Sequence, residues 1–285
     1  MHLLLIAIFS LVAWGIRLLL NPRNGHDVLS LFLIPPLLIF FTFLSVILMG
    51  SGGQMFGVSS SIFAYCMALL LVSLCLFATG RSYWQVRKAL VKIREFPSTV
   101  IFGFESRIVD IDFPYSAQVG FWSSELVVSR GLLEILSEDE LKAVLAHEQS
   151  HRIYHDTFWF FLLEVIKSLS WWLPRSESLW QNLLLLREIR ADKLACQNSD
   201  PFNLAQALLK VAQTIAQTSY TKECRESFSV AFHPNTSNSH LVTRLESILE
   251  GEQPYYWSFP VSAILMSILP LFLIIWHSGS LEPHM

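Results

Sequence analysis

The sequence predicts a mainly α membrane protein with four transmembrane helices and an α+β domain inserted between the third and the fourth. Three observations predict this fold class. Hydrophobic residues make up 53% of the 285 residues and charged residues only 15%, a balance that is unusual for a soluble domain. The apolar residues gather in four long runs. Between the last two runs the pattern changes to short segments rich in β-branched and aromatic residues, followed by amphipathic helices.

Each of the four apolar runs is long enough to cross a bilayer. They comprise residues 3–20, 29–49, 60–79 and 259–276. We interpret the first run as a retained helix rather than a cleaved signal peptide. Its first charge, Arg17, comes late in the run, and the next, Arg23, follows it, whereas a signal peptide carries its positive charges at its start.

A basic segment follows the third run and sets the orientation. It holds five basic residues against one acid, Glu95: Arg81, Arg87, Lys88, Lys92 and Arg94. The positive-inside rule places this segment in the cytoplasm and, counting back, the N-terminus outside. Its helical spacing of apolar residues predicts an amphipathic helix near anionic headgroups; a plain stop-transfer flank is the alternative. The predicted division is three transmembrane helices over 1–80, the juxtamembrane helix over 81–97, a cytoplasmic domain over 98–254, and the fourth transmembrane helix with a short tail over 255–285.

The cytoplasmic domain begins with a predicted small antiparallel sheet. The segments STVIFGF, RIVDIDF, SAQVGF and ELVVS lie between residues 98 and 130 and are rich in Val, Ile and Phe. We expect SAQVGF to be an edge strand. An exposed sheet edge can pair with an extended peptide through main-chain hydrogen bonds.

The next helix carries the residues with the most specific chemistry. Ser137 and Glu140 form a predicted capping box at its start. His147 and His151 are four residues apart and therefore project from one face, with Glu148 beside the first. This is the H-E-x-x-H pattern of zinc metallopeptidases, in which the histidines bind the metal and the glutamate acts on a water molecule. A solvated helix with two surface histidines is the alternative.

A second helix, LLLLREIRADKLA, supplies the acidic residues that such a site needs. Glu188 can complete a two-His, one-Glu site, and Asp192, one turn later, can accept the free N–H of a ligating histidine. The alternative is a pair of exposed carboxylates bonded to basic neighbours on the same helix: Arg187, Arg190 and Lys193.

Two further segments bear on this site. Residues 157–174 are apolar but contain Glu164 and Lys167. A transmembrane helix here would separate His147 from Glu188, so we predict that the segment does not cross the membrane. Residues 221–239 are polar and rich in turn-forming residues, which predicts a loop.

Three stretches together resemble a known family: VVSRGLLEILSEDELKAVLAHEQSHRIYHD, SWWLPRSESLW and LLLREIRADKLA. They resemble the BlaR/MecR-type membrane metallopeptidases, the zinc proteases of β-lactam sensor-transducers, and more distantly the membrane CaaX and heat-shock proteases. The resemblance covers about residues 98–250 and the layout of the four helices. It implies a zincin-like (gluzincin) domain in a bacterial plasma membrane. The sensor-transducers also end in a large extracellular penicillin-binding domain, which we do not expect in this chain, so antibiotic binding is not inferred from the resemblance.

The resemblance also assigns roles. It implies Zn²⁺ held by His147, His151 and Glu188, with Glu148 as general base. Asp156 and Asp192 match the supporting aspartates, and His240 and Arg244 match a His and an Arg near the active site of the CaaX and heat-shock relatives, although Leu241 replaces the proline that usually follows. Tyr154 and His155 are further candidate donors to the developing oxyanion.

Three hypotheses about function follow. The first is regulated cleavage of a cytoplasmic or membrane-proximal protein, either a winged-helix repressor or the chain itself, with Ser227–Phe228 as the first bond to examine. The second is a broad quality-control protease of the heat-shock type, and the third a non-catalytic membrane receptor or scaffold. The partners predicted are membrane lipid and a protein substrate. The net charge of −3 and the lack of a basic patch interleaved with aromatic residues argue against direct nucleic-acid binding, and the sequence predicts no oligomeric state.

Overall fold

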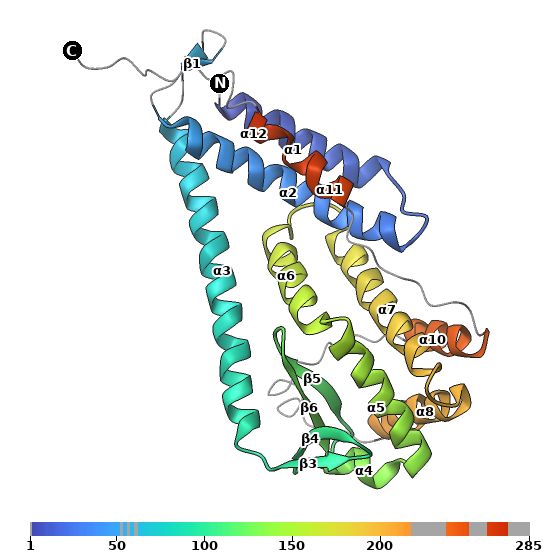
Figure 1. Cartoon of the computed structure of the whole chain (residues 1–285). Helices are drawn as coiled ribbons and strands as arrows, with labels where there is room; N and C mark the ends of the chain where they lie inside the picture. The colour runs from blue at the N-terminus through green and yellow to red at the C-terminus, as the bar shows by residue number, and fades with distance from the viewer. Residues whose placement is uncertain are drawn as a thin grey trace. The chain divides into compact units, whose positions relative to one another are not determined.

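The computed structural model describes residues 2–51, 54–55, 58–59, 62–217, 238–250 and 261–272 (Figure 1). The chain divides into two compact units. The first comprises residues 1–80, 164–183 and 257–285, and the second comprises residues 81–163 and 184–256. Helices α3 (Ile62–Arg94), α6 (Asp156–Leu169) and α7 (Ser176–Ala195) each contribute residues to both units.

The first unit is built from apolar helices. Helices α1 (His2–Leu19) and α2 (Gly25–Met49) pack together, and α11 (Val261–Ser267) and α12 (Leu269–Phe272) lie against α2 (Figure 1). Two antiparallel strands of two residues each, β1 (Gln54–Met55) and β2 (Val58–Ser59), precede α3. Side chains from several of these elements form one apolar cluster: Ala13, Ile39, Phe43, Val46, Ala68 and Leu173.

Three helices, α1, α2 and α3, are long and apolar enough to cross a membrane. They correspond to the first three predicted transmembrane helices and indicate insertion into a membrane. The fourth predicted one falls on α11 and α12, and its residues 259–260 and 273–276 lie outside the described residues. Helix α6 has fourteen residues. It is therefore about 21 Å long, shorter than a hydrocarbon core of about 30 Å, which favours the prediction that residues 157–174 do not cross.

The second unit contains a four-stranded sheet. Its strands are β3 (Ser98–Ile101), β4 (Phe104–Val109), β5 (Ser116–Gly120) and β6 (Ser124–Ser129), in the order β3-β4-β6-β5. The prediction of an antiparallel sheet is wrong for one pair, because β4 and β6 run parallel. Strand β6 lies between β4 and β5 and pairs parallel with the first and antiparallel with the second, so the sheet is mixed. Strand β5 pairs only with β6 among the described strands and is an edge, as predicted for SAQVGF.

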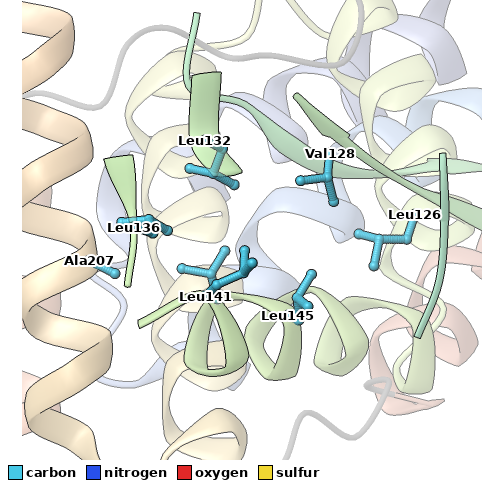
Figure 2. Packing of buried hydrophobic residues seen from close by; sticks show 8 residues of the cluster. Leu126, Val128, Leu132, Leu136, Leu141, Leu145 and Ala207 are labelled. Carbon is cyan, nitrogen blue, oxygen red and sulfur yellow. The ribbon is translucent and has the colours of Figure 1, made fainter. Parts of the chain in front are cut away.

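Helices α4 (Arg130–Ile135), α5 (Glu138–Ile153), α8 (Pro201–Gln217) and α10 (Asn238–Glu250) complete the second unit. Figure 2 shows the core between the sheet and three of these helices, α4, α5 and α8. Leu126 and Val128 of β6 face Leu141 and Leu145 of α5, with Leu132 and Leu136 at the other side and Ala207 of α8 beside them. This apolar contact fixes α5 against the sheet.

The start of α5 is fixed by the predicted capping box. The Ser137 hydroxyl accepts from the backbone N–H of Glu140, and the Glu140 carboxylate accepts from the backbone N–H of Ser137. The carboxylate also binds Lys210 of α8 at 2.7 Å. Burial raises the pKa of the Glu140 carboxyl, but Lys210 and Ser137 outweigh it, and the net pKa lies below its ordinary value. The first turn of α5 is therefore tied to α8 by charge as well as by apolar packing.

Candidate metal centre

Helix α5 presents His147, Glu148 and His151 within the second unit. All three residues lie on the last two turns of the helix, and the first two are buried. His147 Nε2 lies 3.1 Å from His151 Nε2, with the two rings nearly perpendicular. The histidines are therefore not surface residues of a solvated helix.

Helix α7 brings a carboxylate to the same point. Glu188 Oε2 lies 3.4 Å from His147 Nε2, and Glu188 Oε1 lies 3.8 Å from His151 Nε2. Three donor atoms from His147, His151 and Glu188 lie within 4.8 Å of one another and could hold a metal ion. The structure thus brings together side chains that are about forty positions apart in the sequence.

Each histidine has a carboxylate behind it. His151 Nδ1 lies 2.7 Å from Asp156 Oδ2. His147 Nδ1 lies 2.8 Å from Asp192 Oδ1, although its N–H is not aligned with this oxygen. A carboxylate at Nδ1 favours the tautomer that carries its proton there, which leaves the Nε2 lone pair free to bind a metal. Two lone pairs and a carboxylate converging at this spacing repel one another unless a cation lies between them.

Arginines hold the two aspartates in place. Arg244 of α10 forms two hydrogen bonds with Asp192, at 2.7 and 2.8 Å, and lies 3.4 Å from Glu188. Arg190 of α7 binds Asp156 through one guanidinium nitrogen, Nη2, behind the other histidine. Asp192 is fully buried, so it is not the exposed carboxylate of the alternative interpretation. Each ion pair connects a different pair of helices and orients one imidazole.

The electrostatics of the site favour bound positive charge. Burial lowers the pKa of His147, but the Asp192 and Glu188 carboxylates outweigh burial and raise it to about 10. Burial raises the pKa of Glu188, and Arg187, His147 and Arg244 more than reverse this, so the carboxylate stays ionised. The same balance, led by Arg244, lowers the pKa of Asp192. The ionised carboxylates of Glu188 and Asp192 therefore favour positive charge at this position.

Glu188 also forms the ion pair with a basic neighbour on α7 that the alternative interpretation predicts. Arg187 donates from Nε and Nη2 to Glu188 Oε1, at 2.9 and 2.8 Å, and its guanidinium lies over the Phe160 ring. The predicted pairing with Arg187 therefore exists, but it uses one carboxylate oxygen. The other oxygen is the one that faces His147 and Arg244.

Glu148 is bonded to the edge strand. The Ser116 hydroxyl, at the first position of β5, donates to Glu148 Oε1 at 2.7 Å. The neighbouring Tyr115 is buried, and burial together with the Glu148 charge raises the pKa of its hydroxyl. No pattern in the sequence points to Ser116, because a serine at the start of a strand carries no local signal. Only the packing of β5 on α5 brings it to Glu148.

Three other predicted site residues have different contacts. His155 stacks on Trp122 with ring centroids 4.1 Å apart, and its Nδ1 lies 3.1 Å from the Trp122 carbonyl oxygen. Tyr154 lies under the Arg190 guanidinium. His240 lies on α10 one turn before Arg244, and its side chain makes no contact with the metal-site residues in the described part of the chain. Their predicted role as oxyanion donors stays a prediction. The Ser227–Phe228 bond lies outside the described residues.

Comparison with known proteins gives one result for this region. Residues 107–187 match the model of Peptidase family M48. The match contains His147, Glu148 and His151 and ends immediately before Glu188. It supports a metallopeptidase of the M48 family, and together with the three apolar helices it indicates a membrane metalloprotease. A comparison with curated proteins gives no match.

Proposed function

We propose that this chain is a membrane-embedded zinc endopeptidase of the BlaR/MecR type, which cleaves a cytoplasmic or membrane-proximal protein. The observation that carries the proposal is the convergence of His147, His151 and Glu188, with Glu148 adjacent on α5. A structural ion-pair network would not need two imidazole nitrogens and a carboxylate facing one another. A metallopeptidase site needs that arrangement.

Zinc fits the donor set and its spacing. Zinc bonds imidazole nitrogen and carboxylate oxygen at about 2.0–2.1 Å, and a tetrahedral arrangement then separates ligand atoms by about 3.3 Å. The two histidine nitrogens lie 3.1 Å apart, and Glu188 approaches them with different oxygens, Oε2 at 3.4 Å from His147 and Oε1 at 3.8 Å from His151. With one donor atom taken from each residue, the three atoms lie within 4.8 Å of one another. Three protein ligands leave a fourth position for water, as in catalytic rather than structural zinc sites.

The residues of the chain divide the chemistry between them. Bound zinc supplies Lewis acidity, which lowers the pKa of water and polarises a carbonyl group. Glu148 receives a proton from the attacking water and passes it to the leaving amine. The hydrogen bond from Ser116 fixes Oε1 of Glu148 and limits rotation of the carboxylate. Arg244 and Arg190 hold the aspartates that orient the two histidines.

The edge strand offers a place for the substrate. Strand β5 starts at the serine bonded to Glu148 and leaves one side unpaired in the described sheet. An extended peptide that adds to this edge would pass beside the base, held by main-chain hydrogen bonds. The basic residues in the C-terminal part of α3 support a cytoplasmic position for this domain by the positive-inside rule, so we propose a winged-helix repressor or the chain itself as substrate.

The test uses full-length protein purified in detergent. Bound metal is measured by elemental analysis, and cleavage of a candidate repressor and of β-casein is followed by mass spectrometry. The decisive variant is Glu148→Gln, which keeps the side-chain volume and removes the base. Glu134→Gln is the matched control, because Glu134 is an exposed carboxylate on α4. Intact mass of the chain reports self-cleavage in the same samples.

We expect one zinc per chain in all three proteins and cleavage in all but Glu148→Gln. Few cleavage sites, confined to the repressor or to the chain itself, support regulated proteolysis, whereas many sites in casein support the quality-control alternative. Absence of bound zinc after reconstitution would contradict the proposed zinc peptidase function and favour the alternative of a non-catalytic scaffold. Equal cleavage by Glu148→Gln and the unmodified chain would remove Glu148 as the base.

A further inference from the structure

One face of α3 combines basic and aromatic side chains directly after the third apolar run. It comprises Tyr83, Trp84, Arg87, Lys88 and Val91, and we call it the α3 basic face. These five residues line an open pocket of about 440 Å³. The pocket lies within the second unit and away from the metal centre, and the proposed peptidase chemistry makes no use of it.

The other face of the same helix is occupied by the sheet. Leu90 is buried, and Val86 and Ile93 pack with it against β5 and β6 residues such as Val119 and Val127. This packing fixes the rotation of the helix. Trp84, Arg87, Lys88 and Val91 of the α3 basic face are therefore exposed on the side away from the sheet, whereas Tyr83 is about half exposed and its ring stacks on Phe121, directly after β5.

In the part of the chain that the structure describes, the two cations of this face have no acidic partner. Lys88 Nζ lies 3.5 Å from the centre of the Trp84 ring. Neither Arg87 nor Lys88 forms an ion pair with any of the described residues, whereas Arg94, two turns later, pairs with Glu125 at 2.6 Å. Two unneutralised cations beside exposed aromatic rings form a surface that suits an anion with an apolar body.

The helix limits how far this face can lie from the apolar run. Helix α3 is continuous from Ile62 to Arg94, and an α-helix rises 1.5 Å per residue. Trp84 is four residues and Lys88 eight residues beyond Gly80, so they lie within about 6 and 12 Å of it along the helix. The field of an anionic leaflet extends over about one Debye length, roughly 8–10 Å.

We propose that the α3 basic face binds the headgroup of an anionic phospholipid. Arg87 and Lys88 donate to the phosphate oxygens, and Trp84 and Tyr83 lie at the level where aromatic rings prefer the membrane interface. Val91 closes the far end of the pocket. The proposal goes beyond peptidase activity, since it concerns a lipid site whose occupancy can be measured without any substrate.

The test is lipid binding by the full-length chain in detergent, read by native mass spectrometry. The protein is titrated with dioctanoyl phosphatidylglycerol and, separately, with dioctanoyl phosphatidylcholine. We compare the unmodified chain with the double variant Arg87→Gln, Lys88→Gln. A control double variant, Arg130→Gln, Lys142→Gln, also removes one arginine and one lysine charge, but from exposed positions on α4 and α5. The conservative pair Arg87→Lys, Lys88→Arg keeps both charges in place.

The unmodified chain should bind phosphatidylglycerol more tightly than phosphatidylcholine. Each basic residue near an anionic headgroup contributes about a fivefold gain, so the Arg87→Gln, Lys88→Gln variant should bind phosphatidylglycerol roughly 30-fold more weakly. The control and the conservative pair should match the unmodified chain. Equal binding of the two lipids by the unmodified chain would overturn the proposal, as would unchanged phosphatidylglycerol binding after the two glutamine substitutions.

Discussion

Replacing Asp192 with asparagine tests how the metal centre is held together. Asp192 is fully buried and contacts two helices at once, through His147 of α5 and Arg244 of α10. Asparagine has nearly the same volume but carries no charge, so the Arg244 guanidinium stays buried after losing its main partner. Removing one partner of a buried ion pair costs about 3–5 kcal/mol. Glu188 remains 3.4 Å from Arg244 and offsets part of this cost, so we expect a loss of about 3 kcal/mol, the lower end of that range.

This loss is large enough to measure in two ways. For a domain of this size a change of 1 kcal/mol moves Tm by about 2–4 °C, so Asp192→Asn should lower Tm by roughly 6–12 °C. Carboxylates behind metal-binding histidines also support metal affinity, and their removal typically weakens it by about 10- to 100-fold. Thermal unfolding of the metal-free protein gives the first quantity, and zinc titration against a competing chelator gives the second.

The control for this experiment is Asp139→Asn. Asp139 is an exposed carboxylate near the start of α5 and, among the described residues, forms an ion pair with Lys142 alone, at 3.1 Å, so its replacement should change neither quantity much. An Asp192→Asn protein that keeps both its Tm and its zinc affinity would refute the reasoning. A lower Tm with unchanged zinc affinity would leave Asp192 as a structural residue only.

Three further predictions rest on single contacts. Ser116→Ala removes the hydrogen bond to the Glu148 carboxylate, and because hydrogen bonds to charged groups contribute about 1.5–3 kcal/mol, kcat/KM should fall roughly tenfold or more without loss of zinc. Ser116→Thr keeps the hydroxyl and should restore kcat/KM. An unchanged kcat/KM in Ser116→Ala would show that Ser116 has no role in the site. Gly131→Ala would bring a Cβ into collision with a backbone carbonyl of the β4–β5 loop, so the free energy of unfolding should fall by about 1–3 kcal/mol or more; a urea melt that matches the unmodified protein would contradict this contact. The Glu140 carboxyl has a lowered pKa in the folded state, so its contribution to stability is complete above the unfolded pKa of about 4.3 and is lost as pH falls through the lower folded value. The difference in free energy of unfolding between the unmodified protein and Glu140→Gln should therefore narrow as pH drops below about 4. A difference that does not change with pH would show that the interaction with Lys210 is not electrostatic.

Local sequence signals predicted much of the fold. The capping box at Ser137 and the presence of four strands follow from patterns within a few residues, and the structure confirms them, with β3 and β4 shifted by a few residues from the predicted segments. The expected edge position of SAQVGF is also confirmed. The parallel pairing of β4 with β6 was not predictable in this way. It depends on which strand lies beside which, a choice that the packing of the whole sheet on α4 and α5 decides.

The sequence by itself determined the donors of the candidate metal centre. A spacing of four residues on a helix obliges His147 and His151 to share a face, and a helix with Glu188 and Asp192 obliges these two acids to do the same. The tertiary structure alone decided what surrounds them. It selected Ser116 as the partner of Glu148 and Arg244 and Arg190 as the partners of the two aspartates, and it turned His155 toward Trp122. The reason is physical: helical periodicity acts over one or two turns, whereas a buried charge takes the partner that packing brings within reach, wherever that residue stands in the chain.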